Sequence, residues 1–319
     1  MSLFTRRRFS LAALTLLAAS ALPGIACADT VEVRIGYQKS STLTALLKAQ
    51  GTLEKKFAGK DVHLSWSEFT SGAPLLEALN VGGIDLSADV ADTVPIFALA
   101  AGANLAYYAQ ETPSPTAQAI LVRADSPIHD VASLKGKKVA VAKAAGAHYL
   151  LIAALRKAGL KFSDIQPAYL SPADGRAAFE NGSVDAWAVW DPYVAGAQQQ
   201  AKARVLTDGT GIASYRRYYL ASAPFAKAHP EIVQAVFDAL RDTGVWVKAH
   251  PQDAATALAP VWGLDAQTVR IANDRRSYEV RAVNAEALNE EQKIADAFLD
   301  AALIPKAVDT RGAEVWKPQ

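Results

Sequence analysis

The strongest constraint on the fold is a unit that occurs twice in the chain. Residues 77–89 read EALNVGGIDLSAD, and residues 177–191 read AAFENGSVDAWAVWD. Both patterns predict the end of a helix, a capping glycine, and a short apolar strand that ends at an acidic residue. Asp85 and Asp185 hold the same place in the two copies. The repetition predicts two similar halves.

A second matching pair precedes each copy. Residues 33–50 and 138–159 both predict a strand, a loop of small and polar residues, and a helix. Strands that alternate with helices form mostly parallel sheets that are covered on both faces, and ligands bind beyond the carboxyl ends of such strands. We therefore expect an α/β protein of two lobes, each a mixed, mostly parallel sheet flanked by helices, with a cleft between them.

The domain limits follow from breaks in this pattern. We expect a signal peptide over residues 1–28, the first part of lobe 1 over 29–117, lobe 2 over 118–222, and a return to lobe 1 over 223–319. The return is predicted to be mainly helical, with periodic runs at residues 230–249, 251–261, 265–272 and 284–303. The length of 319 residues and the 51% hydrophobic content suit two sizeable cores.

The first residues have the pattern of a secretory signal peptide. Three arginines at 6–8 precede an apolar run at 9–22 and the small residues Ala26-Cys27-Ala28, which predicts cleavage after Ala28 and a periplasmic location. The run is shorter than the roughly 20 apolar residues of a transmembrane helix. Residues 5–11 also fit the twin-arginine pattern, so both export routes stay open. Cys27 is the single cysteine, and its lipidation is an alternative to its removal.

The remaining composition argues against several function classes. After residue 28 the chain has 30 basic and 32 acidic side chains, so it lacks the basic surface of a nucleic-acid-binding protein. The five histidines show no metal-ligand spacing, and the common nucleotide, hydrolase and metalloprotease motifs are missing. We therefore expect a monomeric binding protein with no metal and no cofactor, rather than an enzyme. A Ser–His–Asp site assembled by the fold remains open.

Small and polar residues follow the predicted strand ends, where several helices begin. The first turn of a helix has unpaired N–H groups and a partial positive charge, so these turns predict an anion-binding site. Ser40 and Ser71 could instead be helix caps, Trp190 could be core or cleft wall, and Asp191 could be a turn former. The candidate residues are Gln38, Ser40, Thr70, Ser71, Gly72, Asp89, Val90, Gln110, Gly146, Ala147, His148, Trp190, Asp191 and Tyr215.

Several motifs carry a family resemblance. RIGYQK at 34–39, LKGKKVAV at 134–141, DIQPAYLSPAD at 164–174 and DAWAVWDPY at 185–193 resemble the periplasmic aliphatic-sulfonate-binding (SsuA-like) proteins of ABC importers. The resemblance runs from residue 33 to residue 318. It implies a two-lobed periplasmic binding protein fold (type II) with a two-strand hinge. It also implies an aliphatic sulfonate ligand and delivery to a membrane permease that an ATPase drives.

One departure concerns the start of the helix near residue 146. The family often has Gly-Ser-Ser-Ser-His where this chain reads AAGAH at 144–148, so hydroxyl donors are absent. The main-chain N–H groups of Gly146, Ala147 and His148 are the expected donors, with the His148 side chain as a further candidate. Trp190 and Tyr215 are expected around the ligand tail. The arginines at 216, 217, 275 and 276 could supply cationic contacts, but most of them are expected at the surface.

Other ligands and one enzyme class remain as alternatives. A taurine-binding protein needs an acid near the ammonium group, and Asp89 or Asp191 could serve. Nitrate or a thiamine-related pyrimidine would suit the same fold. An enzyme of pyrimidine synthesis on this fold relies on a cysteine-rich motif, and the chain after residue 28 has no cysteine.

Overall fold

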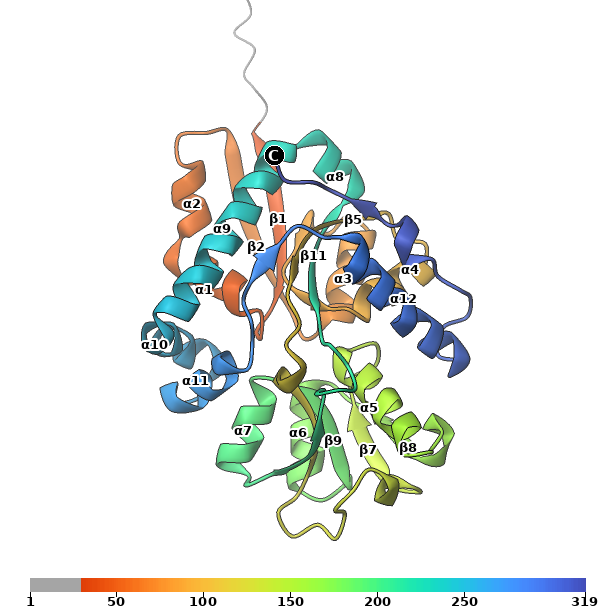
Figure 1. Ribbon diagram of the computed structural model, residues 1–319. Helices are drawn as coiled ribbons and strands as arrows, with labels where there is room; N and C mark the ends of the chain where they lie inside the picture. The colour runs from red at the N-terminus through yellow and green to blue at the C-terminus, as the bar shows by residue number, and fades with distance from the viewer. Residues whose placement is uncertain (1–29) are drawn as a thin grey trace, which may run out of the picture.

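The computed structural model describes residues 30–319 and shows two α/β lobes, one above the other in Figure 1. The predicted signal peptide, with Cys27, lies outside the described residues. The larger sheet has the order β12-β5-β11-β3-β1-β2, and the smaller has the order β10-β6-β9-β7-β8. The strands of the larger sheet are β1 (Val31–Gln38), β2 (Val62–Phe69), β3 (Leu86–Ser87), β4 (Val90–Ala91), β5 (Leu105–Glu111), β11 (Arg217–Ser222), β12 (Val280–Arg281) and β13 (Glu314–Val315). Those of the smaller sheet are β6 (Gln118–Val122), β7 (Lys138–Val141), β8 (Gln166–Tyr169), β9 (Ala186–Trp190) and β10 (Arg204–Asp208).

The repeat seen in the sequence is a repeat of topology. Strand β1 pairs in parallel with β2 and β3, and β7 pairs in parallel with β8 and β9. In both lobes the repeated aspartate is hydrogen-bonded to the central strand of this parallel group. Asp85 accepts a hydrogen bond from the Arg34 N–H at 2.8 Å, and Asp185 accepts one from the Lys138 N–H at 2.8 Å. Each carboxylate therefore satisfies a backbone donor of β1 or β7, the central strand of the parallel group in its lobe.

Helices cover the sheets as the periodicity predicts. Those of the first part of lobe 1 are α1 (Thr42–Gln50), α2 (Thr52–Phe57), α3 (Gly72–Asn80) and α4 (Val94–Ala100), and those of lobe 2 are α5 (Gly146–Lys157), α6 (Pro172–Glu180) and α7 (Tyr193–Gln200). The return contains α8 (Ala223–Ala228), α9 (Pro230–Ala249), α10 (Pro251–Trp262), α11 (Ala266–Asp274) and α12 (Ala285–Asp300). Prolines at the first turns of α9 and α10 suit positions where the N–H has no helical partner. Helices α9 and α12 lie against the upper lobe, so the return to lobe 1 has the expected form (Figure 1).

The chain crosses between the lobes twice, at residues 112–117 and 209–216. The two crossings are hydrogen-bonded to each other, from the Ser114 N–H to the Ser214 carbonyl at 3.1 Å and from the Gly209 N–H to the Pro115 carbonyl at 3.0 Å. The expected end of lobe 2 at residue 222 differs from the structure, because β11 pairs with β3, β4 and β5 of the larger sheet. The break at Ala223–Pro224 marks the start of α8, so the return begins at Arg217.

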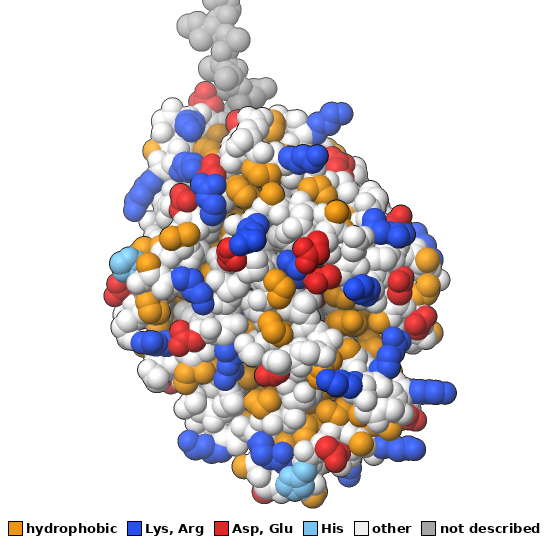
Figure 2. All heavy atoms as spheres, viewed as in Figure 1, with side chains coloured by type: hydrophobic (Ala, Val, Ile, Leu, Met, Phe, Trp, Pro, Cys, Tyr) orange, Lys and Arg blue, Asp and Glu red, His pale blue; other side chains and the backbone are white. Residues whose placement is uncertain are grey.

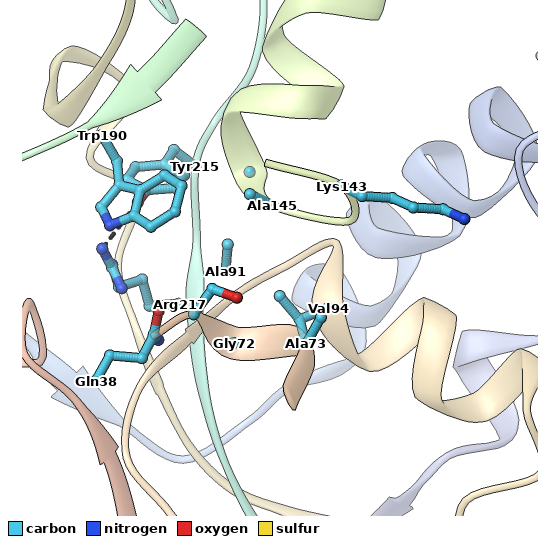
Figure 3. Close-up of a pocket in the computed structure, with 12 residues that line it drawn as sticks. Gln38, Gly72, Ala73, Ala91, Val94, Lys143, Ala145, Trp190, Tyr215 and Arg217 are labelled. Carbon is cyan, nitrogen blue, oxygen red and sulfur yellow. Dashed lines mark hydrogen bonds between the residues drawn. The ribbon is translucent and has the colours of Figure 1, made fainter. Parts of the chain in front are cut away.

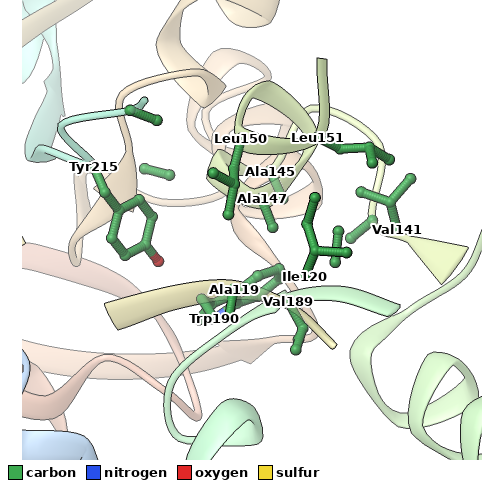
Figure 4. Packing of buried hydrophobic residues seen from close by; sticks show 14 of the residues in the cluster. Ala119, Ile120, Val141, Ala145, Ala147, Leu150, Leu151, Val189, Trp190 and Tyr215 are labelled. Carbon is green, nitrogen blue, oxygen red and sulfur yellow. The ribbon is translucent and has the colours of Figure 1, made fainter. Parts of the chain in front are cut away.

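The buried apolar core is continuous between the lobes. Strands β6, β7 and β9 pack on α5 in lobe 2, as Figure 4 shows around Ile120, Val141 and Leu150. The same cluster includes Leu75 and Val94 of lobe 1, so apolar side chains of the two lobes are in direct contact in this structure. On the face shown in Figure 2, acidic and basic side chains are interspersed. Among residues 30–319, no helix combines the length and apolar character needed to cross a membrane.

Candidate ligand-binding site

A small cavity lies between the lobes and receives residues from both. Its volume is about 10 Å³, roughly the space of one water molecule. Lobe 1 supplies strand ends and the starts of α3 and α4, and lobe 2 supplies the loop before α5 and the end of β9 (Figure 3). The lining residues are Gln38, Ser71, Gly72, Ala73, Ala91, Val94, Lys143, Ala145, Gly146, Trp190, Tyr215 and Arg217.

Helices α3, α4 and α5 begin at this cavity, and none of them has a side-chain cap. The cap residues of α3 and α5 are Ser71 and Ala145, and neither side chain accepts a hydrogen bond from its helix. By contrast, the Ser171 hydroxyl caps α6 and the Asn284 amide caps α12. The first N–H groups of α3 and α5 therefore remain available, and the helix dipoles add partial positive charge. This arrangement suits an anion.

The first residues of α3 and α5 are glycines because of close packing. A Cβ atom on Gly72 would lie 2.9 Å from a Val94 methyl group. A Cβ atom on Gly146 would lie 2.5 Å from the Tyr215 ring and 3.1 Å from the Ala91 methyl group. Real Cβ atoms do not approach other heavy atoms as closely as 2.5 Å. Glycine at 146 is therefore required for the lobes to meet as they do.

Arg217 places a guanidinium beside the cavity. Its Nη1 donates to Asp89 at 2.6 Å and its Nη2 donates to the Tyr215 hydroxyl at 2.8 Å. Its Nε is buried and has no hydrogen-bond partner within the described part of the chain. A buried donor without an acceptor costs free energy, about 1–3 kcal/mol for a polar group. An anionic ligand would supply the missing acceptor.

A buried ionic cluster holds Arg217 in place. Arg276 donates to both Glu111 oxygens at 2.7 Å and to Asp89 at 3.2 Å. Burial alone would lower the pKa of Arg276, but the carboxylates of Glu111 and Asp89 raise it well above its ordinary value. Burial also raises the pKa of Tyr215 to about 12, so its hydroxyl stays protonated. Two arginines and two carboxylates leave the cluster neutral.

Six of the residues expected from the sequence line this cavity: Gln38, Ser71, Gly72, Gly146, Trp190 and Tyr215. The Gln38 amide donates to the Asp89 carbonyl at 2.9 Å, which fixes its orientation. Ser40 does not line the cavity but contacts a residue that does: its hydroxyl accepts a hydrogen bond from the Trp190 indole N–H at 3.3 Å. Trp190 is both buried and a wall residue, so the two interpretations of this residue both apply.

Other expected residues lie outside the lining. Thr70 is exposed, Val90 is buried in the core, and Asp89 is paired with arginines behind the cavity. The Gln110 amide donates to the Ala282 carbonyl instead. Asp191 accepts from the Ala195 N–H at 3.0 Å and from Arg275.

The structure corrects the expectation for the start of α5. The His148 imidazole packs against Phe162, Tyr169 and Phe298, with ring centroids 5.2 to 5.5 Å apart, and burial lowers its pKa to about 4. The His148 N–H already donates to the Ala145 carbonyl at 2.9 Å. Ala147 is fully buried in the core of lobe 2 (Figure 4). Neither side chain lines the cavity, and of the three expected main-chain donors the N–H groups of Gly146 and Ala147 remain candidates.

The sequence reasoning missed the role of the arginines. It allowed cationic contacts but expected most of these arginines at the surface, whereas Arg216, Arg217 and Arg276 are each less than 10% exposed. A signal was present, because Arg217 begins RYYLAS, a run apolar enough to be a central strand. A charge in such a strand needs a buried partner. The wall residues Ala73, Ala91, Val94, Lys143 and Ala145 were also not expected.

The described residues contain no group of three or more histidine, cysteine, aspartate or glutamate side chains that could hold a metal ion. The two crossings, the paired lobes and the anion-suited cavity between them define a solute-binding protein of the two-lobed periplasmic type.

Comparisons with known proteins agree with this class. Residues 57–254 match the family model described as NMT1/THI5 like, and the chain belongs to this family. It is 43% identical to an Escherichia coli protein named putative aliphatic sulfonates-binding protein, over 98% of this chain and 97% of that one.

Two further relatives are informative. The structure of the alkanesulfonate-binding protein SsuA from Xanthomonas axonopodis, bound to MOPS, is 39% identical with a TM-score of 0.85, and covers 91% of this chain and 99% of that one. A taurine-binding periplasmic protein of Escherichia coli is 30% identical over 69% of this chain and 68% of that one. The resemblance to SsuA-like proteins, which the motifs indicated, is thereby confirmed.

Proposed function

We propose that this protein binds aliphatic sulfonates between its lobes and delivers them, in the periplasm, to the permease of an ABC importer. The observation that carries the proposal is the meeting of two uncapped helix starts, at Gly72 and Gly146, with the unpaired Nε of Arg217. A sulfonate stays ionised at every physiological pH and offers three acceptor oxygens. Fixed donors therefore suit it, and no titrating base is needed.

The lining gives the ligand a direction. In Figure 3, Gln38, Trp190 and Arg217 lie on one side of the cavity, and Ala73 and Val94 lie on the other. The sulfonate head belongs near Arg217 and the N–H groups of Gly72 and Gly146, and the alkyl tail belongs against the side chains of Ala73 and Val94. This places Trp190 beside the head, whereas the sequence reasoning expected it around the tail. Each charge-assisted hydrogen bond would contribute about 1.5–3 kcal/mol, so several suffice for micromolar affinity after the cost of association.

Binding requires the lobes to separate. A cavity of about 10 Å³ is too small to admit a sulfonate with its tail, so the lobes must open before the ligand enters and then close around it. The paired crossings at residues 112–117 and 209–216 are the natural hinge. The closed, loaded form then presents a surface from both lobes to the permease, which an ATPase drives. We propose that the protein acts as a monomer and reaches the periplasm by its signal peptide, through the general or twin-arginine route.

The alternatives lose support from the site. Taurine would need a free carboxylate for its ammonium group, but Asp89 is paired with Arg217 and Arg276. Asp191 is paired with Arg275. The cysteine-dependent enzyme alternative lacks its residue, since the described chain contains no cysteine.

Isothermal titration calorimetry tests the proposal directly. The protein is purified without sulfonate buffers, denatured, refolded to release carried ligand, and titrated with ethanesulfonate, nitrate and sulfate. We expect micromolar or tighter binding of ethanesulfonate and weak binding of the inorganic anions. Binding of nitrate with no binding of any alkanesulfonate would overturn the proposed ligand class.

A further inference from the structure

Lys143 is a cation at the edge of the cavity that the sulfonate head does not require. It lies in the loop before α5, lines the cavity and is exposed to solvent. In Figure 3 it lies on the side of Ala73 and Val94, opposite Trp190 and Arg217, with its ammonium pointing outward. Among residues 30–319, no carboxylate lies within 4.0 Å of this ammonium.

The positive charge of Lys143 has no compensating negative charge among the residues that line the cavity. No carboxylate is among the lining residues, and the Arg217 charge is compensated by Asp89 at 2.6 Å. The neutral arginine–carboxylate cluster serves the head of the ligand. Lys143 therefore contributes an uncompensated positive charge at the side where the tail must leave.

We propose that Lys143 determines specificity by the charge of the ligand tail, so that the site prefers sulfonates with an anionic tail group to neutral ones, and neutral ones to cationic ones. This inference rests on the proposed function. Short sulfocarboxylates are the favoured substrate class, because a carboxylate two bonds beyond the sulfur can approach the Lys143 ammonium as it turns inward. An ammonium at the same place meets repulsion and finds no acid among the lining residues.

The expected size of the effect follows from the exposure of Lys143. An ion pair at a solvent-exposed site contributes little, so removing the charge should change affinity by about three- to fivefold. The effect should grow at lower ionic strength, because exposed charges are screened by salt. The chain flanking Lys143 is rigidly held by the Thr93 hydroxyl, which donates to the Ala144 carbonyl at 2.6 Å.

The experiment compares three ligands of similar size: sulfoacetate, propanesulfonate and taurine, which carry an anionic, a neutral and a cationic tail. Calorimetric titrations use the wild type, Lys143→Met, Lys143→Glu and the control Lys135→Met. Lys135 is an exposed lysine of the same lobe that does not line the cavity. Thermal unfolding confirms that each variant is folded.

The wild type and Lys135→Met should bind sulfoacetate most tightly and taurine most weakly. Lys143→Met should lose about three- to fivefold in sulfoacetate affinity and change propanesulfonate affinity by less than twofold. Lys143→Glu should favour taurine over sulfoacetate. If the three ligands keep the same order in all variants, the role of Lys143 is refuted while sulfonate binding stands. If neither the wild type nor any variant binds a sulfonate, the proposed function is refuted, and this inference is refuted with it.

Discussion

Arg275 joins the two lobes in the closed form, and its removal should weaken ligand binding without touching the ligand. It follows α11, in the return to lobe 1. Its Nη1 lies 3.3 Å from both oxygens of Asp191 at the end of β9, and its Nη2 donates to Gln198 on α7 at 2.6 Å. Asp191 and Gln198 both belong to lobe 2. When the cleft opens, the contacts of Arg275 with Asp191 and Gln198 must either break or move together with lobe 2.

The magnitude follows from burial. Asp191 is 3% exposed, and burial raises its pKa to about 6 even with Arg275 beside it. Without Arg275 the carboxylate keeps the Ala195 N–H and loses its counter-charge. Breaking a fully buried pair costs about 3–5 kcal/mol, and partial solvent access to Arg275 reduces this to about 1–2 kcal/mol. Because only the closed form pays this cost, Arg275→Met should weaken sulfonate affinity about 5- to 30-fold.

The assay is calorimetry for affinity together with small-angle X-ray scattering for closure. Arg275→Met should need more ligand to reach the compact form, and its unfolding temperature without ligand should change little. Arg270→Met is the matched control, since Arg270 lies on α11, is partly exposed, and pairs with Asp274 within the same lobe. If Arg275→Met and Arg270→Met bind and close like the wild type, the contact contributes nothing to closure and the reasoning is refuted.

Three further outcomes are expected. Arg217→Met should lower sulfonate affinity about 10- to 150-fold by calorimetry, because it removes a charge-assisted donor. Unchanged affinity would exclude Arg217 from the site. Gly146→Ala should weaken ligand binding and closure, because the new Cβ would lie 2.5 Å from the Tyr215 ring. The control Gly196→Ala, whose nearest contact is at 3.5 Å, should behave as the wild type in calorimetry and in scattering. Burial raises the pKa of Asp92 to about 7, so the folded state binds this proton more tightly than the unfolded state. Stability should therefore rise as pH falls from 8 to 6, by at most about 1.4 kcal/mol per pH unit. Asp92→Asn should flatten this slope in urea titrations, and an unchanged slope would assign it to other groups.

The repeat made most of the fold predictable from the sequence. The helix, glycine and strand pattern around Asp85 and Asp185 is local, and the structure uses both aspartates in the same way. The lobe limit at residue 222 was not predictable, because the pairing of β11 is a long-range choice that propensity does not encode.

The site was also predictable only in part, because some of its features are local in the sequence and others depend on tertiary contacts. Strand ends and helix starts are local features, so Gln38 and Gly72 could be placed from the sequence. The orientation of a helix is a tertiary feature, and one position along α5 separates Gly146 in the cavity from Ala147 in the core. The apolar strand indicated that Arg217 needs a buried partner, but the partner itself, Asp89, lies 128 positions away in the chain and could not be identified from the sequence.

The duplication also indicates which parts of the molecule serve the ligand and which serve stability. Helices α3 and α6 follow β2 and β8, the strands that pair in parallel with β1 and β7, and each begins after a serine, Ser71 or Ser171. Ser171 caps its helix by accepting from the Asp174 N–H, and a cap of this kind contributes about 0.5–2 kcal/mol. Ser71 has the same residue type and place but makes no cap, and its helix start is the one that faces the cavity. Because α7, α9 and α10 also lack a side-chain cap, the position of the α3 start at the cavity, rather than the missing cap itself, is what suits it to an anion.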